Sequence, residues 1–470
     1  MGFRTGIVAS VDLLALSSSC ARRCSATRSV RISRCAASTR RLLRLRDQGH
    51  ALAGRTARDS MASTLSGLAS GRNEQQGGAR SCLRAIVAML ISSLLYVVYT
   101  AQTPLSVRPG AGYDDGLFMK LGAFLAQGEW LGPYNFVTLA KGPGYPAFLA
   151  VNAWLGLPVS VAHGLFQCTA VALLAWVVVK LSRSSALGLA VFLITLWHPV
   201  FPVARILRDA IYPGQVLLVL ACASSALFVA ERRGERALWG GATGLVLGWF
   251  WLTREEGVWL LPGLGVLLLF FALRGWRARE PLLTLLAPLA SALLSFSIAQ
   301  IAFQSGNWIA YGSFVGVDFK ERNFQRAVGA LQSVRAEHQI PYVAISRATR
   351  ARIYEVSPAF ATLEDHLDPP DRASPWQEGC KHYPWTCGEI AGGWIVWALR
   401  SASAEEGYYR SPADASAFFD AVASQVEAAC RDARLDCDPL WISTMPSVTP
   451  EQLSIIPGTF PEDQRNTLQL

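Results

Sequence analysis

Apolar residues in this chain gather in stretches long enough to cross a membrane. Seven stretches of about 17 to 23 residues have no charge in their interior, and an α-helix needs this length to cross the hydrocarbon of a bilayer. They run over residues 84–103, 159–180, 186–204, 211–231, 237–253, 257–273 and 281–303. The pattern predicts an all-α polytopic membrane protein with about seven transmembrane helices.

Two shorter segments between the first and second stretches also have helical character. Apolar side chains recur at helical spacing over 117–125, with polar residues between them. This pattern predicts a helix that lies on the membrane surface. The segment 144–156 is apolar but too short to cross, so we expect a second interfacial or re-entrant helix there.

The chain becomes more polar after the seventh stretch. Residues 304–470 contain paired prolines, Pro369 and Pro370, and a helical pattern over 413–429. We therefore expect a transmembrane domain at 83–303, followed by a small α-rich domain outside the membrane at 304–470.

Residues 1–82 form a low-complexity segment rich in Arg, Ser and Ala. Residues 1–84 contain fifteen Arg and four acidic residues, whereas the whole chain has a net charge of +9, so the remainder is slightly acidic. Three interpretations stay open: a disordered cytoplasmic tail, an organelle transit peptide, or sequence upstream of a later start at Met61. Because the basic charge sits in this one segment beside an apolar stretch, nucleic acid is not expected as a partner.

Basic residues in the short loops predict the topology, since Lys and Arg there favour the cytoplasmic side. If the N-terminus is cytoplasmic, three basic loops agree with this rule, at 180–183, 232–236 and 274–279. The segments that then lie outside are 104–158, 205–210, 254–256 and the C-terminal domain.

Four cysteines lie in the predicted outer domain, where an oxidising compartment permits disulfides. They are Cys380, Cys387, Cys430 and Cys437. The two spacings of seven residues favour local pairs, Cys380 with Cys387 and Cys430 with Cys437. A zinc site is the rival interpretation, although neither pair has the short spacing that structural zinc sites prefer.

Ionisable residues gather at the predicted outer face and are the best guide to chemistry. The first outer loop has adjacent carboxylates, Asp114 and Asp115, before its predicted helix, and Lys141 after it. One interpretation is that the two acids cap the N-terminus of that helix. The other is that Asp114 accepts a proton from an incoming hydroxyl, or that both acids help to hold a divalent cation near a phosphate.

Two further charged clusters are predicted at the same face. Their members are Arg205, Arg208 and Asp209 in a short loop, and Arg254, Glu255 and Glu256 after the fifth stretch. Two Arg in an outer loop contradict the positive-inside tendency, which indicates an anionic partner. For the second cluster, an internal Arg–Glu pair and phosphate recognition by Arg are both open.

The order of these motifs resembles the GT-C glycosyltransferases, and among them the ArnT-like and protein O-mannosyltransferase-like group. It runs from the first stretch through residues 113–116 (YDDG), 141–146 (KGPGYP) and 253–257 (TREEG), within a resemblance that covers about residues 84–320. In that family an essential Asp, usually followed by another acid, precedes a Lys-Pro-Pro-like motif. Asp114, Asp115 and Lys141 match these positions, but Gly142 replaces the first proline.

The resemblance implies a GT-C-like fold in a bacterial inner membrane. It also implies inverting transfer of a sugar from a polyprenyl-phosphate donor to a hydroxyl of a glycan, lipid or protein. The catalytic acids would be Asp114 and Asp115; the phosphate-binding residues would be Lys141, Arg205, Arg208 and Arg254, supported by Asp209, Glu255 and Glu256. No cofactor is implied with certainty; a divalent metal ion at the two Asp residues is one alternative.

A transporter or flippase of an anionic lipid-linked substrate and a non-catalytic membrane scaffold remain as alternatives. A transporter often has charges near the middle of the bilayer and internal repeats, whereas the charges here lie at one predicted face. The chain contains no Walker A, HExxH or GxSxG motif. Gly240, Gly244 and Gly248, spaced by four, predict close helix packing rather than nucleotide binding.

Overall fold

The computed structural model describes residues 80–107, 113–201, 204–370, 376–381, 383–438, 440–442 and 445–446. Most of the basic N-terminal segment, Met61 included, lies outside the described residues. Contacts divide the chain into two compact units, and each is treated by itself. Unit 1 contains the chain up to 107, 152–250 and 257–296, and unit 2 contains 108–151, 251–256 and the chain from 297 onward.

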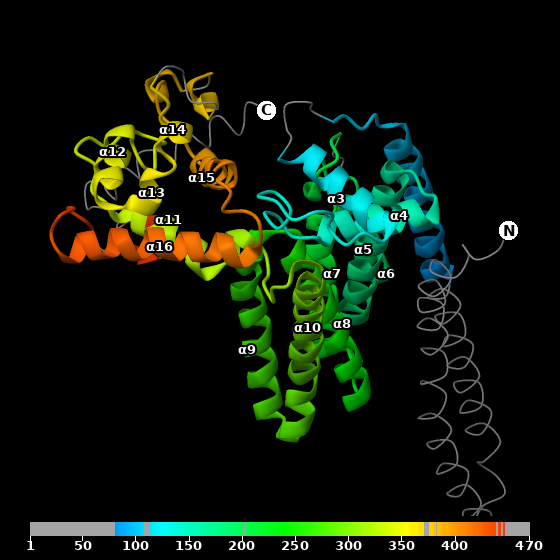
Figure 1. Cartoon of the computed structure of the whole chain (residues 1–470). Coiled ribbons are helices and arrows are strands. Elements are labelled where there is room, and N and C mark those ends of the chain that lie inside the picture. The colour runs from blue at the N-terminus through cyan, green and yellow to red at the C-terminus, as the bar shows by residue number, and fades with distance from the viewer. Residues whose placement is uncertain are drawn as a thin grey trace, which may run out of the picture. The chain divides into compact units, whose positions relative to one another are not determined.

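The described chain is predominantly helical (Figure 1). After the helix Arg80–Gln102, the α-helices are α3 (Asp115–Gln127), α4 (Gly144–Leu155), α5 (Val159–Ser182), α6 (Ser185–Leu196), α7 (Tyr212–Ser224), α8 (Arg233–Thr253), α9 (Leu261–Arg277), α10 (Leu282–Tyr311), α11 (Arg322–Ser333), α12 (Arg347–Val356), α13 (Pro358–Ala361), α14 (Glu364–Leu367), α15 (Trp394–Glu405) and α16 (Pro412–Arg431). The shorter helical turns are η1 (Arg208–Ala210), η2 (Ser225–Val229), η3 (Glu255–Leu260), η4 (Asp318–Lys320), η5 (Gln377–Lys381) and η6 (Pro384–Thr386). Two short strands, β1 (Leu440–Ile442) and β2 (Met445–Pro446), pair antiparallel.

Five helices in the described part of the chain are long and apolar enough to cross a membrane. They are Arg80–Gln102, Val159–Ser182, Tyr212–Val229, Gly257–Arg277 and Leu282–Tyr311. Each corresponds to one of the seven predicted stretches, which supports a helical membrane protein. The other two stretches are also helical, as the 12-residue α6 and the 21-residue α8. Neither of them meets both criteria of length and hydropathy, so seven crossings remain a prediction.

Unit 1 is built on contacts among its first helix, α5, α6 and α7. Ser184 begins α6 by accepting a hydrogen bond from the Leu187 amide at 3.2 Å, and this cap closes a short turn after α5. The Gln167 side chain of α5 donates to the Ala210 carbonyl at 2.8 Å, next to the start of α7. A buried cluster that includes Tyr96, Val171 and Phe192 joins the first helix to α5 and α6.

Unit 2 has two hydrophobic cores. The larger one lies among α11, α12, α15 and α16, and Tyr113, Tyr134 and Phe136 of the first loop pack against it. The smaller one combines α3 with the end of α10 through residues such as Leu117, Leu139 and Phe303. The first loop therefore folds with segments that follow it by more than 150 residues.

Helices appear where the shorter patterns predict them. The 117–125 pattern lies in α3, the 144–156 segment corresponds to α4, and the 413–429 pattern lies in α16. In α3 the apolar residues Leu117, Phe118 and Leu121 are buried, in agreement with its amphipathic pattern.

Two disulfides close short loops in the C-terminal part of unit 2. They join Cys380 to Cys387 and Cys430 to Cys437, the two pairs that the spacing favours. The second loop is also tied to the end of α11, because the Asp438 amide donates to the Ser333 carbonyl at 2.8 Å. A covalent link and a backbone link thus hold the residues that follow α16.

Candidate functional site

Asp114 and Lys141 form an ion pair across the first loop of unit 2. Asp114 occupies the N-cap position of α3, yet its side chain accepts no hydrogen bond from that helix. The Asp114 side chain is 48% exposed, whereas the Lys141 side chain is 10% exposed. The pair therefore has one member that a substrate can reach and one that is held inside the protein.

Asp115 occupies a different environment from Asp114. It lies in the first turn of α3 and is fully buried. A carboxylate in a first turn is favoured by the partial positive charge of the helix N-terminus. The capping interpretation thus suits the position of Asp115 better than that of Asp114.

Aromatic rings surround the Lys141 ammonium. Its Nζ atom lies 5.3 Å from the centre of the Phe118 ring and 5.6 Å from that of the Trp397 ring. Tyr113 packs on the same Trp397 with ring centres 4.8 Å apart. A cation is attracted to the face of an aromatic ring, so these contacts help to hold the Lys141 side chain at its mostly buried position.

The loop that carries Lys141 packs directly on the end of α8. A Cβ atom added at Gly142 would collide with the Leu252 carbonyl oxygen, and one added at Gly144 would collide with the Thr253 side chain. Only a residue without a side chain permits this approach, which explains glycine at both positions. The KGPGYP and TREEG motifs, about 110 residues apart in the chain, thus meet in unit 2, with Arg254 next in the chain after the contact.

Asp318 and Arg400 also hold the loop that carries Lys141, through contacts separate from those with α8. The Asp318 amide donates to the Leu139 carbonyl at 2.8 Å, two residues before Lys141. The Asp318 carboxylate accepts from Arg400 Nη2 at 3.0 Å, and Arg400 Nε donates to the Phe136 carbonyl at 2.8 Å. Burial raises the pKa of Asp318 above its usual value, while the charge of Arg400 opposes that shift. Because Arg400 and Trp397 share α15, the same network places the ring beside Lys141.

The network of Asp318 and Arg400 leaves little trace in the sequence. Arg400 and Phe136 are 264 residues apart, and each looks like an ordinary residue of its own segment. The only signals were an Arg within the apolar segment 394–402 and an isolated Asp after the seventh stretch. A fully buried Arg needs a partner, and this requirement is visible only when the burial is known.

The other predicted site residues are divided between the units. Arg254 is partly buried in unit 2, and only the backbone of Glu255 and Glu256 is described, in η3. Arg205, Arg208 and Asp209 are partly buried in unit 1, the last two within η1. Their contact with the Asp114 and Lys141 pair remains a prediction.

A metal site was one alternative for the two Asp residues. Among the residues that the structure describes, no three His, Cys, Asp or Glu side chains come together in an arrangement that would hold an ion. A metal held by Asp114 and Asp115 alone stays a prediction.

Comparison with known proteins identifies no relative: no family model, no curated protein and no solved structure matches this chain.

Proposed function

We propose that this protein is a membrane glycosyltransferase that moves a sugar from a polyprenyl-phosphate donor to a hydroxyl acceptor at the non-cytoplasmic face. The observation that carries the proposal is the Asp114 and Lys141 ion pair on a loop seated against Leu252 and Thr253. It combines a reachable carboxylate with a sheltered cation. The reaction needs these two groups, one as a base and the other as a partner for phosphate.

In the proposed reaction, Asp114 is the general base. The acceptor oxygen attacks the anomeric carbon while the bond from that carbon to the phosphate oxygen breaks, and the hydroxyl proton passes to the Asp114 carboxylate. One displacement of this kind inverts the anomeric centre. The leaving polyprenyl phosphate gains a negative charge, so cations at its oxygens stabilise the transition state more than the ground state.

Lys141 has two roles in this mechanism. In the absence of donor its ammonium neutralises Asp114. A donor phosphate that takes over Lys141 leaves the Asp114 carboxylate available to accept the hydrogen bond of the acceptor hydroxyl. Binding of the donor thus frees the base for the acceptor. One well-placed hydrogen-bonding cation, such as the Lys141 ammonium, contributes about 3 to 4 kcal/mol to transition-state stabilisation.

In the proposal Arg254 also binds a phosphate oxygen, because a guanidinium matches phosphate with two parallel hydrogen bonds, and Glu255 and Glu256 orient its side chain. The sequence pattern predicts a phosphate-binding role for Arg205 and Arg208 as well, oriented by Asp209. The sequence pattern supports this part of the proposal. Asp115, in contrast, serves mainly to stabilise the start of α3.

Seven membrane crossings belong to the same proposal, and contacts within unit 1 support counting α6. The Ser81 and Ser185 hydroxyls lie 3.2 Å apart at the starts of the first helix and α6, and Trp197 Nε1 donates to Ser92 Oγ at 2.9 Å. Farther along, the Ser106 amide donates to the Ala204 carbonyl at 2.8 Å. These contacts meet the first helix near its start, near its middle and just after its end, in the order of both segments. The described residues from 185 onward therefore run parallel to the first helix, which supports a third crossing.

Similar contacts support a crossing by α8. Arg236 near its start pairs with Glu280, just before α10. Gly240 then packs on Pro288 and Gly244 on Ala292, so the two helices run parallel and in close contact. Gly240 and Gly244, two of the three glycines spaced by four, thus serve helix packing, as expected. With both crossings, the two ends of the chain lie on opposite sides, and the basic loops favour a cytoplasmic N-terminus. In the proposal the C-terminal part with its disulfides is then periplasmic or extracellular, in a bacterial inner membrane.

The proposal is tested by deleting the gene in its own organism and measuring lipid-linked sugars by mass spectrometry. We expect one polyprenyl-phosphate sugar to accumulate, because its consumer is missing. The wild-type gene on a plasmid should return that lipid to its normal level. An unchanged lipid profile, or full restoration by Asp114→Asn expressed at the wild-type level, would contradict the proposal.

A further inference from the structure

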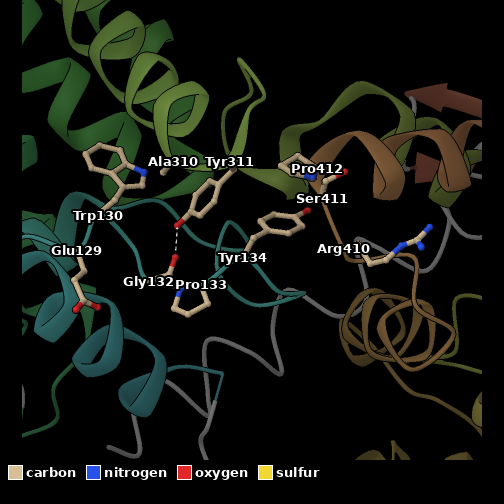
Figure 2. A pocket seen from close by; sticks show the side chains of 10 residues that line it. All are labelled: Glu129, Trp130, Gly132, Pro133, Tyr134, Ala310, Tyr311, Arg410, Ser411 and Pro412. Carbon is tan, nitrogen blue, oxygen red and sulfur yellow. Dashed lines mark hydrogen bonds between the residues drawn. The ribbon is translucent and has the colours of Figure 1, made fainter.

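A cavity in unit 2 lies apart from the proposed reaction centre. Its volume is about 620 Å³, which is within the range of ordinary small-molecule pockets. It is lined by residues of the loop after α3, the last turn of α10 and the segment that leads into α16, namely Glu129, Trp130, Gly132, Pro133, Tyr134, Ala310, Tyr311, Arg410, Ser411 and Pro412 (Figure 2). Neither Asp114 nor Lys141 is among them.

Two aromatic side chains in this cavity, Trp130 and Tyr311, are held in place by hydrogen bonds from their polar edges. Trp130 Nε1 donates to Asn307 Oδ1 at 2.9 Å, and the Tyr311 hydroxyl donates to the Gly132 carbonyl at 2.8 Å. The Tyr134 and Tyr311 rings have centres 5.5 Å apart. Gly132 has a φ of +78°, and a Cβ there would collide with the Phe124 ring, so glycine is needed for this turn. Fixed rings form a binding surface that loses little entropy when a ligand arrives.

Two charged groups of opposite sign complete the cavity. Glu129 and Arg410 are exposed and lie at opposite ends of it, with the Tyr134 and Tyr311 rings between them (Figure 2). The Arg410 side chain is 80% exposed, and its ion pair with Asp414 is long, at 3.7 Å. A carboxylate accepts hydrogen bonds and a guanidinium donates them. The cavity thus offers both functions without a net charge of either sign.

We propose that this cavity binds a neutral carbohydrate, a part of the acceptor other than the hydroxyl that reacts at Asp114; the inference rests on the proposed function. A sugar ring has an apolar C–H face that packs on an aromatic ring and an edge of hydroxyls that donate and accept hydrogen bonds. The fixed aromatic rings match the apolar C–H face. Glu129 and Arg410 match the hydroxyls. An anionic lipid head group fits less well, because Glu129 would repel it.

The position of the cavity in the chain fits an acceptor site. Trp130 and Tyr134 belong to the same loop that continues to Lys141, and Leu131 and Leu139 of that loop share one buried cluster. An occupant that orders residues 129–134 therefore acts on the segment that holds the proposed phosphate-binding Lys141.

The test measures carbohydrate binding directly, with the full chain in lipid nanodiscs, because many detergents carry sugar head groups. The probes are neutral trisaccharides of glucose, mannose and galactose in α and β linkage, and a set of short neutral peptides, all measured by microscale thermophoresis. We expect at least one trisaccharide to bind and no peptide to bind. Binding of peptides alone, or of no probe, overturns the proposal.

Variants locate the binding and separate it from catalysis. Glu129→Gln and Arg410→Ala change exposed side chains, so folding should be kept, and each should weaken trisaccharide binding about tenfold or more. Trp130→Leu should abolish it, whereas Trp385→Ala, an exposed ring elsewhere in unit 2, should leave it unchanged. Equal affinity in wild type, Glu129→Gln and Arg410→Ala would place the binding elsewhere and overturn the inference.

Asp114→Asn distinguishes the two proposals. It should bind the trisaccharide with wild-type affinity, since Asp114 does not line the cavity. Trisaccharide binding with no sugar transfer by the wild-type protein would refute the glycosyltransferase and leave the carbohydrate cavity standing. Sugar transfer without trisaccharide binding would refute the carbohydrate cavity and leave the glycosyltransferase standing.

Discussion

At the scale of single residues, the site depends on how far each charge is buried. Asp114 and Asp115 are neighbours in sequence, but one is half exposed and paired with Lys141 while the other is inside the first turn of α3. Sequence spacing predicts that an acid is present, but its exposure depends on the packing around α3. The same limit applies to Asp318, whose importance comes from its contacts with Leu139 and Arg400.

Replacing Lys141 should slow transfer while the protein stays folded. In the proposed reaction Lys141→Ala removes the cation at the departing phosphate, and such a loss costs about 3 to 4 kcal/mol, or two to three orders of magnitude in rate. The rate is measured with saturating donor and acceptor. Lys120→Ala, an exposed lysine on α3, is the matched control and should keep the wild-type rate. Equal rates for the two variants would argue against a phosphate at Lys141.

Replacing Asp318 should cost stability. Asp318→Asn leaves the buried Arg400 guanidinium without its carboxylate, and breaking a buried ion pair destabilises a protein by about 3 to 5 kcal/mol. Chemical denaturation in nanodiscs gives the free energy of unfolding. Arg335→Ala removes exposed ion pairs to Asp436 and Asp438 and should have no measurable effect. A small loss for Asp318→Asn would mean that the network does not position the loop.

At the scale of elements, hydropathy predicts most of the helices and misses how they pack. Each of the seven apolar stretches contains a helix, because length and composition favour it. The short α6 shows the limit: Pro199 and Pro202 follow it, and proline cannot continue a helix, so the apolar stretch is longer than the helix. The contact between the Lys141 loop and the end of α8 was not predictable, since nothing local marks it.

The close contact between the Lys141 loop and the end of α8 predicts the effect of a methyl group at Gly142. Gly142→Ala should destabilise the protein by about 1 to 3 kcal/mol and lower activity, because the new Cβ meets the backbone of Leu252, which cannot move away cheaply. Gly316→Ala, in an open loop of the same unit, is the control and should be tolerated. The readouts are thermal unfolding and the transfer rate. Full tolerance at Gly142 would show that the loop does not need this close approach.

At the scale of the whole molecule, the account requires that the chemistry and the disulfides share one side of the membrane. The basic loops predict this arrangement, and the parallel runs of α6 with the first helix and of α8 with α10 support it. An odd number of crossings places the two ends of the chain on opposite sides.

Labelling of introduced cysteines tests this topology. In cells with an intact inner membrane, an impermeant maleimide should label Glu337→Cys in the C-terminal part if that segment lies outside, as proposed. Glu231→Cys, after the predicted fourth crossing, should be labelled only after lysis; both positions are exposed. The unchanged protein gives the background from its native cysteines. Labelling of Glu231→Cys alone in intact cells would invert the topology.

The measurement closest to the central claim is transfer by Asp114→Asn. Purified wild type, Asp114→Asn and Asp115→Asn are compared in nanodiscs, with the polyprenyl-phosphate sugar that accumulates on deletion as donor and with folding checked by thermal unfolding. Asn keeps the size of Asp but cannot take up the proton. The account predicts that Asp114→Asn unfolds like wild type and has no detectable transfer, while Asp115→Asn retains some. Near-normal transfer by a folded Asp114→Asn would contradict it.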